Sequence, residues 1–109
     1  MSIEVAGRLD PPAARGRYLV EWYRLELAED VLKHTVNTLE ASAATVGESA
    51  PVKLLAMLAV PADEVVFGVF TADSADVVAE VCHQAGIPAQ RLTAAFAVRN
   101  PTVAERFQR

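Results

Sequence analysis

The segment 52–60, Val-Lys-Leu-Leu-Ala-Met-Leu-Ala-Val, is apolar at every position except Lys53, and it constrains the fold more than any other feature. A second apolar segment, 65–71, follows after a short turn that begins with Pro61. This composition predicts two strands joined as an antiparallel hairpin. Alternate strand residues point to opposite faces of a sheet. Strict alternation therefore predicts two apolar faces for the first strand: Val52, Leu54, Ala56, Leu58 and Val60 on one, and Leu55, Met57 and Ala59 on the other.

The rest of the chain supplies two helices and two more strands. Apolar residues recur at three- and four-residue steps over 26–46, which predicts an amphipathic helix. A second helix is expected to be capped by Asp73 or Ser74 and to run to about Ala85. The remaining strands are expected at 17–23 and 92–99.

The resulting order is β-α-β-β-α-β, which predicts a ferredoxin-like α+β fold with a four-stranded antiparallel sheet and both helices on one face. The chain has 109 residues, 52% of them hydrophobic and 22% charged. Such a chain has room for one domain with one core. We expect this domain over 17–99, with an N-terminal extension at 1–16 and a C-terminal tail at 100–109.

Two helices cover only one face of this sheet, whereas the strands are apolar on both. An uncovered apolar face of this size exceeds what a monomer usually exposes to water. We therefore expect a second copy of the chain to cover it, so that two sheets face each other in a dimeric α/β barrel. In the alternative arrangement, the extension or the tail folds over the face.

Charge and composition exclude several partners. The net charge is −4 and there is no cluster of Lys and Arg, so a nucleic-acid partner is not expected. No apolar run approaches the length of a membrane helix, and the first residues lack the apolar run of an export signal. We expect a cytoplasmic protein that does not bind membranes.

Three short motifs carry a resemblance to a known family: Tyr18-Leu-Val-Glu21, Pro61-x-Asp-Glu-Val-Val-Phe67 and Ala85-Gly-Ile-Pro88-Ala-x-Arg91. Together they resemble a small bacterial family of ferredoxin-like proteins that pair into dimeric α/β barrels and carry a nickel-binding label. The resemblance spans 17–99. It implies a homodimer and nickel as a candidate ligand.

The chain departs from the family pattern at three places. Trp22 stands where the family usually has arginine, and Arg24-Leu25-Glu26 stands where a Pro-Gly turn is common. Gly68 stands where a cysteine often occurs. All three departures lie near the expected pocket, so the nickel label does not transfer directly.

The expected chamber between the two sheets has three candidate lining residues, Glu21, Tyr23 and Met57. Glu21 shares a strand face with Leu19 and Tyr23, and a carboxylate in an apolar chamber can act as a general acid or base. In the alternative interpretation, Glu21 is a strand-edge carboxylate that pairs with a nearby cation. Its candidate partners are Arg24, Lys53 and Arg99.

Two pairs of side chains have spacing suited to metal binding. Asp30 and His34 are four residues apart on the first predicted helix, and Glu80 and His83 are three apart on the second, so each pair shares a helix face. Nickel favours imidazole nitrogen together with oxygen donors. Ordinary solvated helix pairs have the same spacing. The single cysteine, Cys82, falls on an apolar helix stripe and is expected to be a buried structural thiol.

These features favour a dimeric protein that binds a small ligand without catalysis, the ligand being nickel, another divalent metal or a small apolar molecule. A rival is a cofactor-independent monooxygenase or isomerase with its site in the chamber, since dimeric barrels of this type host such enzymes. Glu21, Tyr23 and His34 would then be its polar candidates. A third alternative is a module that docks its sheet face on another protein.

Overall fold

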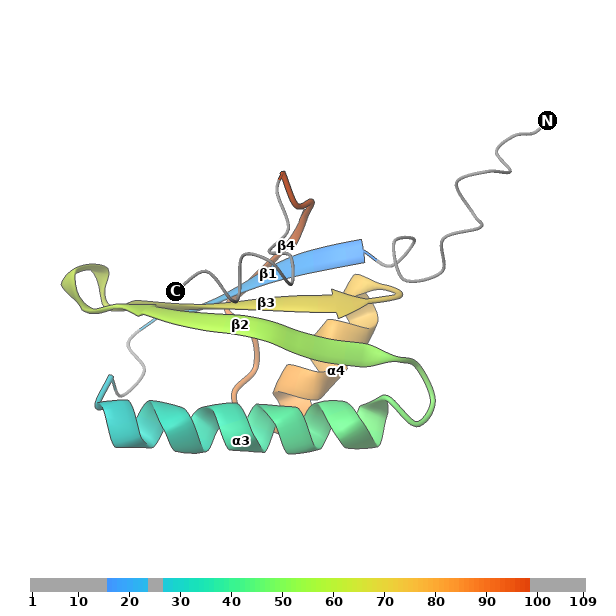
Figure 1. The fold of residues 1–109 in the computed structure, drawn as a ribbon, viewed down its shortest axis with the longest axis horizontal. Helices are drawn as coiled ribbons and strands as arrows, with labels where there is room; N and C mark the ends of the chain where they lie inside the picture. Colours follow the sequence, from blue (N-terminus) through green and yellow to red (C-terminus); the bar gives the residue numbers. More distant parts are fainter. Residues whose placement is uncertain (1–15, 24–26, 99–109) are drawn as a thin grey trace, which may run out of the picture.

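The computed structural model describes residues 16–23 and 27–98. The elements are β1 (Gly16–Tyr23), α3 (Glu29–Val46), β2 (Val52–Val60), the 3-10 turn η1 (Pro61–Asp63), β3 (Val65–Ala72), α4 (Ala75–Gln84) and β4 (Arg91–Ala95). The strands form one four-stranded sheet in the order β2-β3-β1-β4, and all neighbouring pairs are antiparallel (Figure 1). The predicted ferredoxin-like α+β fold is confirmed.

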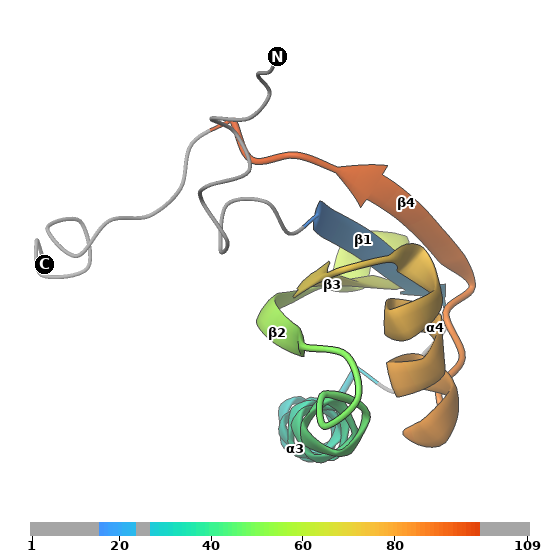
Figure 2. The same ribbon diagram turned by 90° about the vertical axis from the view of Figure 1, so that its right-hand side faces the viewer.

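The two helices lie on the same side of the sheet, as predicted (Figure 2). Within the described part of the chain, no helix lies on the opposite side. We call that opposite side the open face. The expected tail at 100–109 and the expected extension at 1–16 lie outside the described residues, apart from Gly16, which begins β1.

The core lies between the helices and the sheet, and Trp22 on β1 is its largest fully buried side chain. The indole Nε1 of Trp22 donates a hydrogen bond to the carbonyl oxygen of Ile87 at 2.8 Å. That hydrogen bond joins β1 to the loop after α4. The other fully buried side chains are Phe70, Leu39, Val20, Val66, Val78, Val81 and Cys82.

The C-terminal end of α4 determines the path of the loop whose Ile87 carbonyl accepts the hydrogen bond from Trp22. Gly86 adopts a positive φ of 84°, which favours glycine. Its N–H donates to the His83 carbonyl at 3.0 Å, and the N–H of Ile87 donates to the Cys82 carbonyl at 3.0 Å. This pair of hydrogen bonds is a Schellman motif, which ends the helix and turns the chain back toward the sheet.

Strict alternation on β2 was a wrong expectation, because a β-bulge interrupts the strand at Leu55. Leu54 pairs with Phe70 and Ala56 pairs with Val69, so one extra residue lies between two consecutive rungs. A bulge of this kind shifts every later side chain to the other face. The helix side of β2 therefore carries Val52, Leu54, Met57 and Ala59, and the open face carries Lys53, Ala56, Leu58 and Val60.

The last strand is shorter than predicted. β4 ends at Ala95 rather than Arg99, and the following residues Phe96 and Val98 are 84% and 90% exposed. They lie beyond the strand, so neither side chain belongs to a face of the sheet. The expected first helix begins three residues later, at Glu29, and the residues 24–26 before it lie outside the described part.

Candidate functional site

The predicted pocket residues were expected to line the open face, so we first identify the residues that lie on it. Residues paired across neighbouring strands lie on the same face, so the strand registers define its members. They are Lys53, Ala56, Leu58 and Val60 on β2; Val65, Phe67, Val69 and Thr71 on β3; Arg17, Leu19, Glu21 and Tyr23 on β1; and Arg91, Thr93 and Ala95 on β4.

The middle of the open face is apolar. One rung carries Ala56, Val69 and Leu19, and the next carries Leu58 and Phe67 before it reaches Glu21. The Leu58 side chain is 65% exposed on this face. The predicted second apolar face of the sheet is therefore present, with membership on β2 changed by the bulge.

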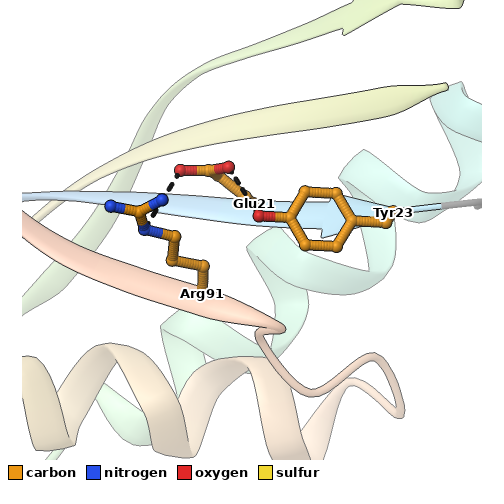
Figure 3. Close-up of polar contacts among 3 residues, drawn as sticks. All are labelled: Glu21, Tyr23 and Arg91. Atoms are coloured by element: carbon orange, nitrogen blue, oxygen red, sulfur yellow. Dashed lines mark hydrogen bonds and ion pairs between the residues drawn. The ribbon is translucent and has the colours of Figure 1, made fainter. Parts of the chain in front are cut away.

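A polar cluster lies at one end of this apolar area. The Tyr23 hydroxyl donates a hydrogen bond to Glu21 Oε1 at 2.7 Å, and Arg91 Nε lies 3.7 Å from Glu21 Oε2 (Figure 3). The Glu21 side chain is 15% exposed, whereas that of Arg91 is 64% exposed. The cluster thus combines a largely buried carboxylate with a phenol and an accessible guanidinium.

Backbone contacts hold this cluster in place. The N–H of Gln90 donates to the Glu21 carbonyl at 3.0 Å, and the N–H of Tyr23 donates to the side-chain oxygen of Gln90 at 2.6 Å. These two contacts fix the start of β4 against the end of β1. Arg91 consequently pairs with Glu21 in the strand register.

The expectation that Glu21 and Tyr23 share a face is confirmed, and the cation partner of Glu21 is one that sequence reasoning missed. Lys53 lies on β2, which is separated from β1 by β3, and its register partner is Thr71 rather than the Phe67 that pairs with Glu21. Arg24 and Arg99 lie outside the described residues. Predicting Arg91 as the partner would have required the register of β4 against β1, which pairs Glu21 with Arg91.

Met57 does not join this cluster. Its register partner is Gly68, whose own partner on β1 is Val20, so Met57 lies on the helix side of the sheet. It packs there against the buried core. The bulge at Leu55 is the reason, because without it Met57 would lie on the other face.

The hydrogen bond to the Glu21 carboxylate raises the pKa of the Tyr23 hydroxyl above its ordinary value of 10.0. Desolvation and the negative charge of Glu21 act in the same direction, and Arg91 acts against them. Tyr23 is therefore protonated at neutral pH and donates a hydrogen bond to Glu21.

The metal candidates lie on the helices. Asp30 and His34 are exposed on α3, and Glu80 and His83 are exposed on α4. Glu80 Oε2 accepts a hydrogen bond from Gln84 Nε2 at 2.7 Å. Among the described residues, no three His, Cys, Asp or Glu side chains are grouped closely enough to hold a metal ion together.

Two shallow grooves of about 270 Å³ each lie elsewhere on the molecule. One is lined by Glu40, Ala43, Ala44, Val52, Lys53 and Leu54, at the edge strand β2, and the other by Thr38, Ala41, Ser42, Thr45, Gln84 and Ala85, between the helices. Neither groove contains Glu21, Tyr23 or a histidine.

Comparison with known proteins supports the fold. No family model matches the chain. No curated protein matches it. The crystal structure of SCO4226 from Streptomyces coelicolor A3(2) is similar, with a TM-score of 0.63, 18% sequence identity, and coverage of 71% of this chain and 91% of that chain. At this identity the similarity shows a shared small ferredoxin-like fold.

Within the described residues, neither α3 nor α4 combines the length and apolar character that a membrane crossing requires.

Proposed function

We propose that this chain is a homodimeric protein that binds a small ligand, without catalysis, between two sheets packed through their open faces. The observation that carries the proposal is the pairing of an apolar area with one built polar cluster on the same face. Leu58, Phe67 and Leu19 provide the apolar part, and Glu21 with Arg91 provides the polar part.

A second copy of the chain is the occupant that fits the open face best. A two-fold interface brings the same patch together from both subunits, so the apolar middle of one face meets the apolar middle of the other. Stacked sheets pack about 10 Å apart. The side chains of Ala56, Thr93 and Ala95 on this face are small, which favours room for a ligand between two such sheets.

The polar cluster offers both kinds of hydrogen-bonding group. The separation of 3.7 Å between Arg91 Nε and Glu21 Oε2 is an ion pair and is longer than a hydrogen bond. The guanidinium N–H groups of Arg91 therefore retain capacity to donate to a ligand. Glu21 supports the cluster as the acceptor that orients Tyr23.

Sedimentation equilibrium of the purified chain tests the dimer. We expect a mass of two chains for the wild-type protein and of one chain for Leu58→Asp, which introduces a charge into the apolar middle. The matched control is Val31→Asp on α3, where the native side chain is 38% exposed away from the open face. A monomeric wild-type protein would refute the proposal, as would a Leu58→Asp variant that dimerises like the control.

Nickel binding is a second candidate function, and the exposure of His34 and His83 favours it. Each imidazole is accessible on a helix that also carries a carboxylate one turn away, at Asp30 and Glu80 respectively. Ni²⁺ should then raise the melting temperature of the wild-type protein, and His34→Ala or His83→Ala should abolish that rise. Asn37→Ala, an exposed change on α3, serves as the control. An unchanged response in both histidine variants would exclude these sites.

A further inference from the structure

The strands and the helices of this acidic protein carry opposite charge. On the described strands the charged residues are Arg17, Lys53 and Arg91 together with a single carboxylate, Glu21, and the registers place all four on the open face. The described helices and turns instead carry Lys33 and the carboxylates Glu29, Asp30, Glu40, Glu48, Asp63, Glu64, Asp73, Asp76 and Glu80. The chain as a whole has a net charge of −4. Counted over 16–23 and 27–98, the open face is therefore the basic side of an acidic chain.

The excess positive charge is concentrated at one end of the face. Arg17 and Lys53 both pair in register with Thr71, one from each side, so two cations flank a hydroxyl group on a single rung. Arg91 lies on a different rung, where Glu21 compensates its charge. This arrangement separates a neutralised polar end from a cationic end along the strand direction.

Within the described part of the chain, neither cation of this end forms an ion pair. No ion pair of Arg17 or Lys53 with a described residue occurs within 4.0 Å. Lys53 also borders the groove that contains Glu40, but no ion pair joins the two side chains. Arg17 is half-buried and Lys53 is exposed.

Packing two open faces together brings two such cationic ends into one interface. Desolvating like charges without a counterion is unfavourable. A divalent cation is also disfavoured there, since it would add to the positive potential. An anion positioned between the cations and Thr71 removes this cost, because guanidinium, ammonium and hydroxyl groups all donate hydrogen bonds.

We infer that the ligand of the open face is an anionic amphiphile, with its carboxylate or similar anion held by Arg17, Thr71 and Lys53 and its apolar part lying over Leu19 and Val69. This inference rests on the proposed function, because it assigns the ligand class of the same face. The rung of Arg17 lies roughly 13 Å along β1 from that of Glu21, at about 3.3 Å per residue. An extended alkyl chain of about this length can therefore lie on the open face between the Arg17 rung and the polar cluster of Glu21, Tyr23 and Arg91.

Isothermal titration calorimetry with matched probes tests the ligand class. We expect decanoate to bind at least tenfold more tightly than decanol, which has the same chain and no charge, and more tightly than acetate, which has the same anion and no chain. Decyltrimethylammonium should bind more weakly than decanol. Equal binding of decanoate and decanol would overturn the inference, and so would acetate binding as tightly as decanoate.

Charge-removing variants test the residues. Arg17→Gln combined with Lys53→Gln should weaken decanoate binding by about tenfold or more, the size expected for charged hydrogen bonds, and leave decanol binding unchanged. Lys33→Gln on α3 makes the same kind of charge change away from the face and should have no effect. An undiminished affinity for decanoate in the double variant would refute the site. Sedimentation of the same samples distinguishes this result from a failure of the dimer itself.

Discussion

The indole of Trp22 lies directly over Gly68. A Cβ atom placed on Gly68 would come within 2.9 Å of Trp22 Cζ3 and 3.0 Å of Cη2. The indole cannot easily move away, because it is buried and its Nε1 is hydrogen-bonded to the Ile87 carbonyl. The large indole on β1 therefore occupies the space above Gly68 on β3, where a side chain would not fit.

Gly68→Ala should therefore destabilise the protein, by about 1–3 kcal/mol as is typical of overpacked cores. Urea denaturation followed by far-ultraviolet circular dichroism measures the change in every variant, because the variants at Trp22 lack the single tryptophan of the chain. Trp22→Phe alone should also destabilise, because it removes the indole that fills this space and leaves the Ile87 carbonyl without its donor. In the double variant the cost of the alanine should largely disappear, giving a non-additive cycle. Strictly additive effects would contradict the proposed contact.

The arrangement of elements was predictable because it depends on local patterns. Alternation on β1 has no interruption, so Glu21 and Tyr23 were correctly placed together on one face. On β2 no glycine or proline marks the bulge at Leu55, and a uniformly apolar strand hides a shift of face. Met57 was assigned to the wrong face for that reason.

Arg91 was missed for a different reason. Its position depends on the alignment of β4 with β1, which is set by the contacts of Gln90 with Glu21 and Tyr23. These contacts join residues far apart in the sequence, and no spacing rule connects them. The charge separation between the sheet and the helices was hidden for the same reason, since Arg17 and Lys53 are placed on one rung only by pairing with Thr71.

Alkaline titration should detect the hydrogen bond between Tyr23 and Glu21. The folded chain holds the Tyr23 proton more tightly than the unfolded chain, because the pKa is raised above 10.0. The stabilisation is therefore present below pH 10.0 and is lost as the pH rises through the higher pKa of the folded state. Ultraviolet titration, with Tyr23→Phe as the reference, should show this phenol ionising above pH 10.0. Glu21→Gln should lower that pKa, and an unchanged titration in Glu21→Gln would contradict the assignment.

Cys82 should behave as an inert thiol in the folded protein. Burial raises its pKa to about 12, so the thiol is neutral at physiological pH and is 0% exposed. A thiol reagent at pH 8 should label it only at the rate at which the chain unfolds, and labelling should accelerate in urea. Rapid labelling of the native protein would contradict its burial.

The same thiol gives a pH dependence with a defined sign. Because the pKa rises from 9.0 in the unfolded chain to about 12 in the folded chain, the contribution of Cys82 is complete below pH 9.0 and declines toward pH 12. The free energy of unfolding should therefore decrease between pH 9 and pH 11. Cys82→Ala should show a smaller decrease over that range, and an identical decrease in both proteins would show that another group causes it.

The proposed dimer should become tighter as the salt concentration rises, contrary to the behaviour of interfaces held by ion pairs. Among the described residues, each open face carries three cations, Arg17, Lys53 and Arg91, and one carboxylate, so two faces without ligand repel each other while their apolar middles attract. Raising NaCl from about 0.01 M to about 1 M shortens the screening length from about 30 Å to about 3 Å and removes most of this repulsion. Sedimentation equilibrium should show the dimer dissociation constant falling over this range.

Two variants serve as controls for this prediction. The dimer of the Arg17→Gln, Lys53→Gln double variant should be tighter than the wild-type dimer at low salt and nearly insensitive to salt. The dimer of Lys33→Gln should follow the wild-type protein. A wild-type dimer that weakens as the salt concentration rises would contradict this account. It would show that attraction between opposite charges holds the two faces together, rather than apolar contact that is opposed by repulsion between like charges.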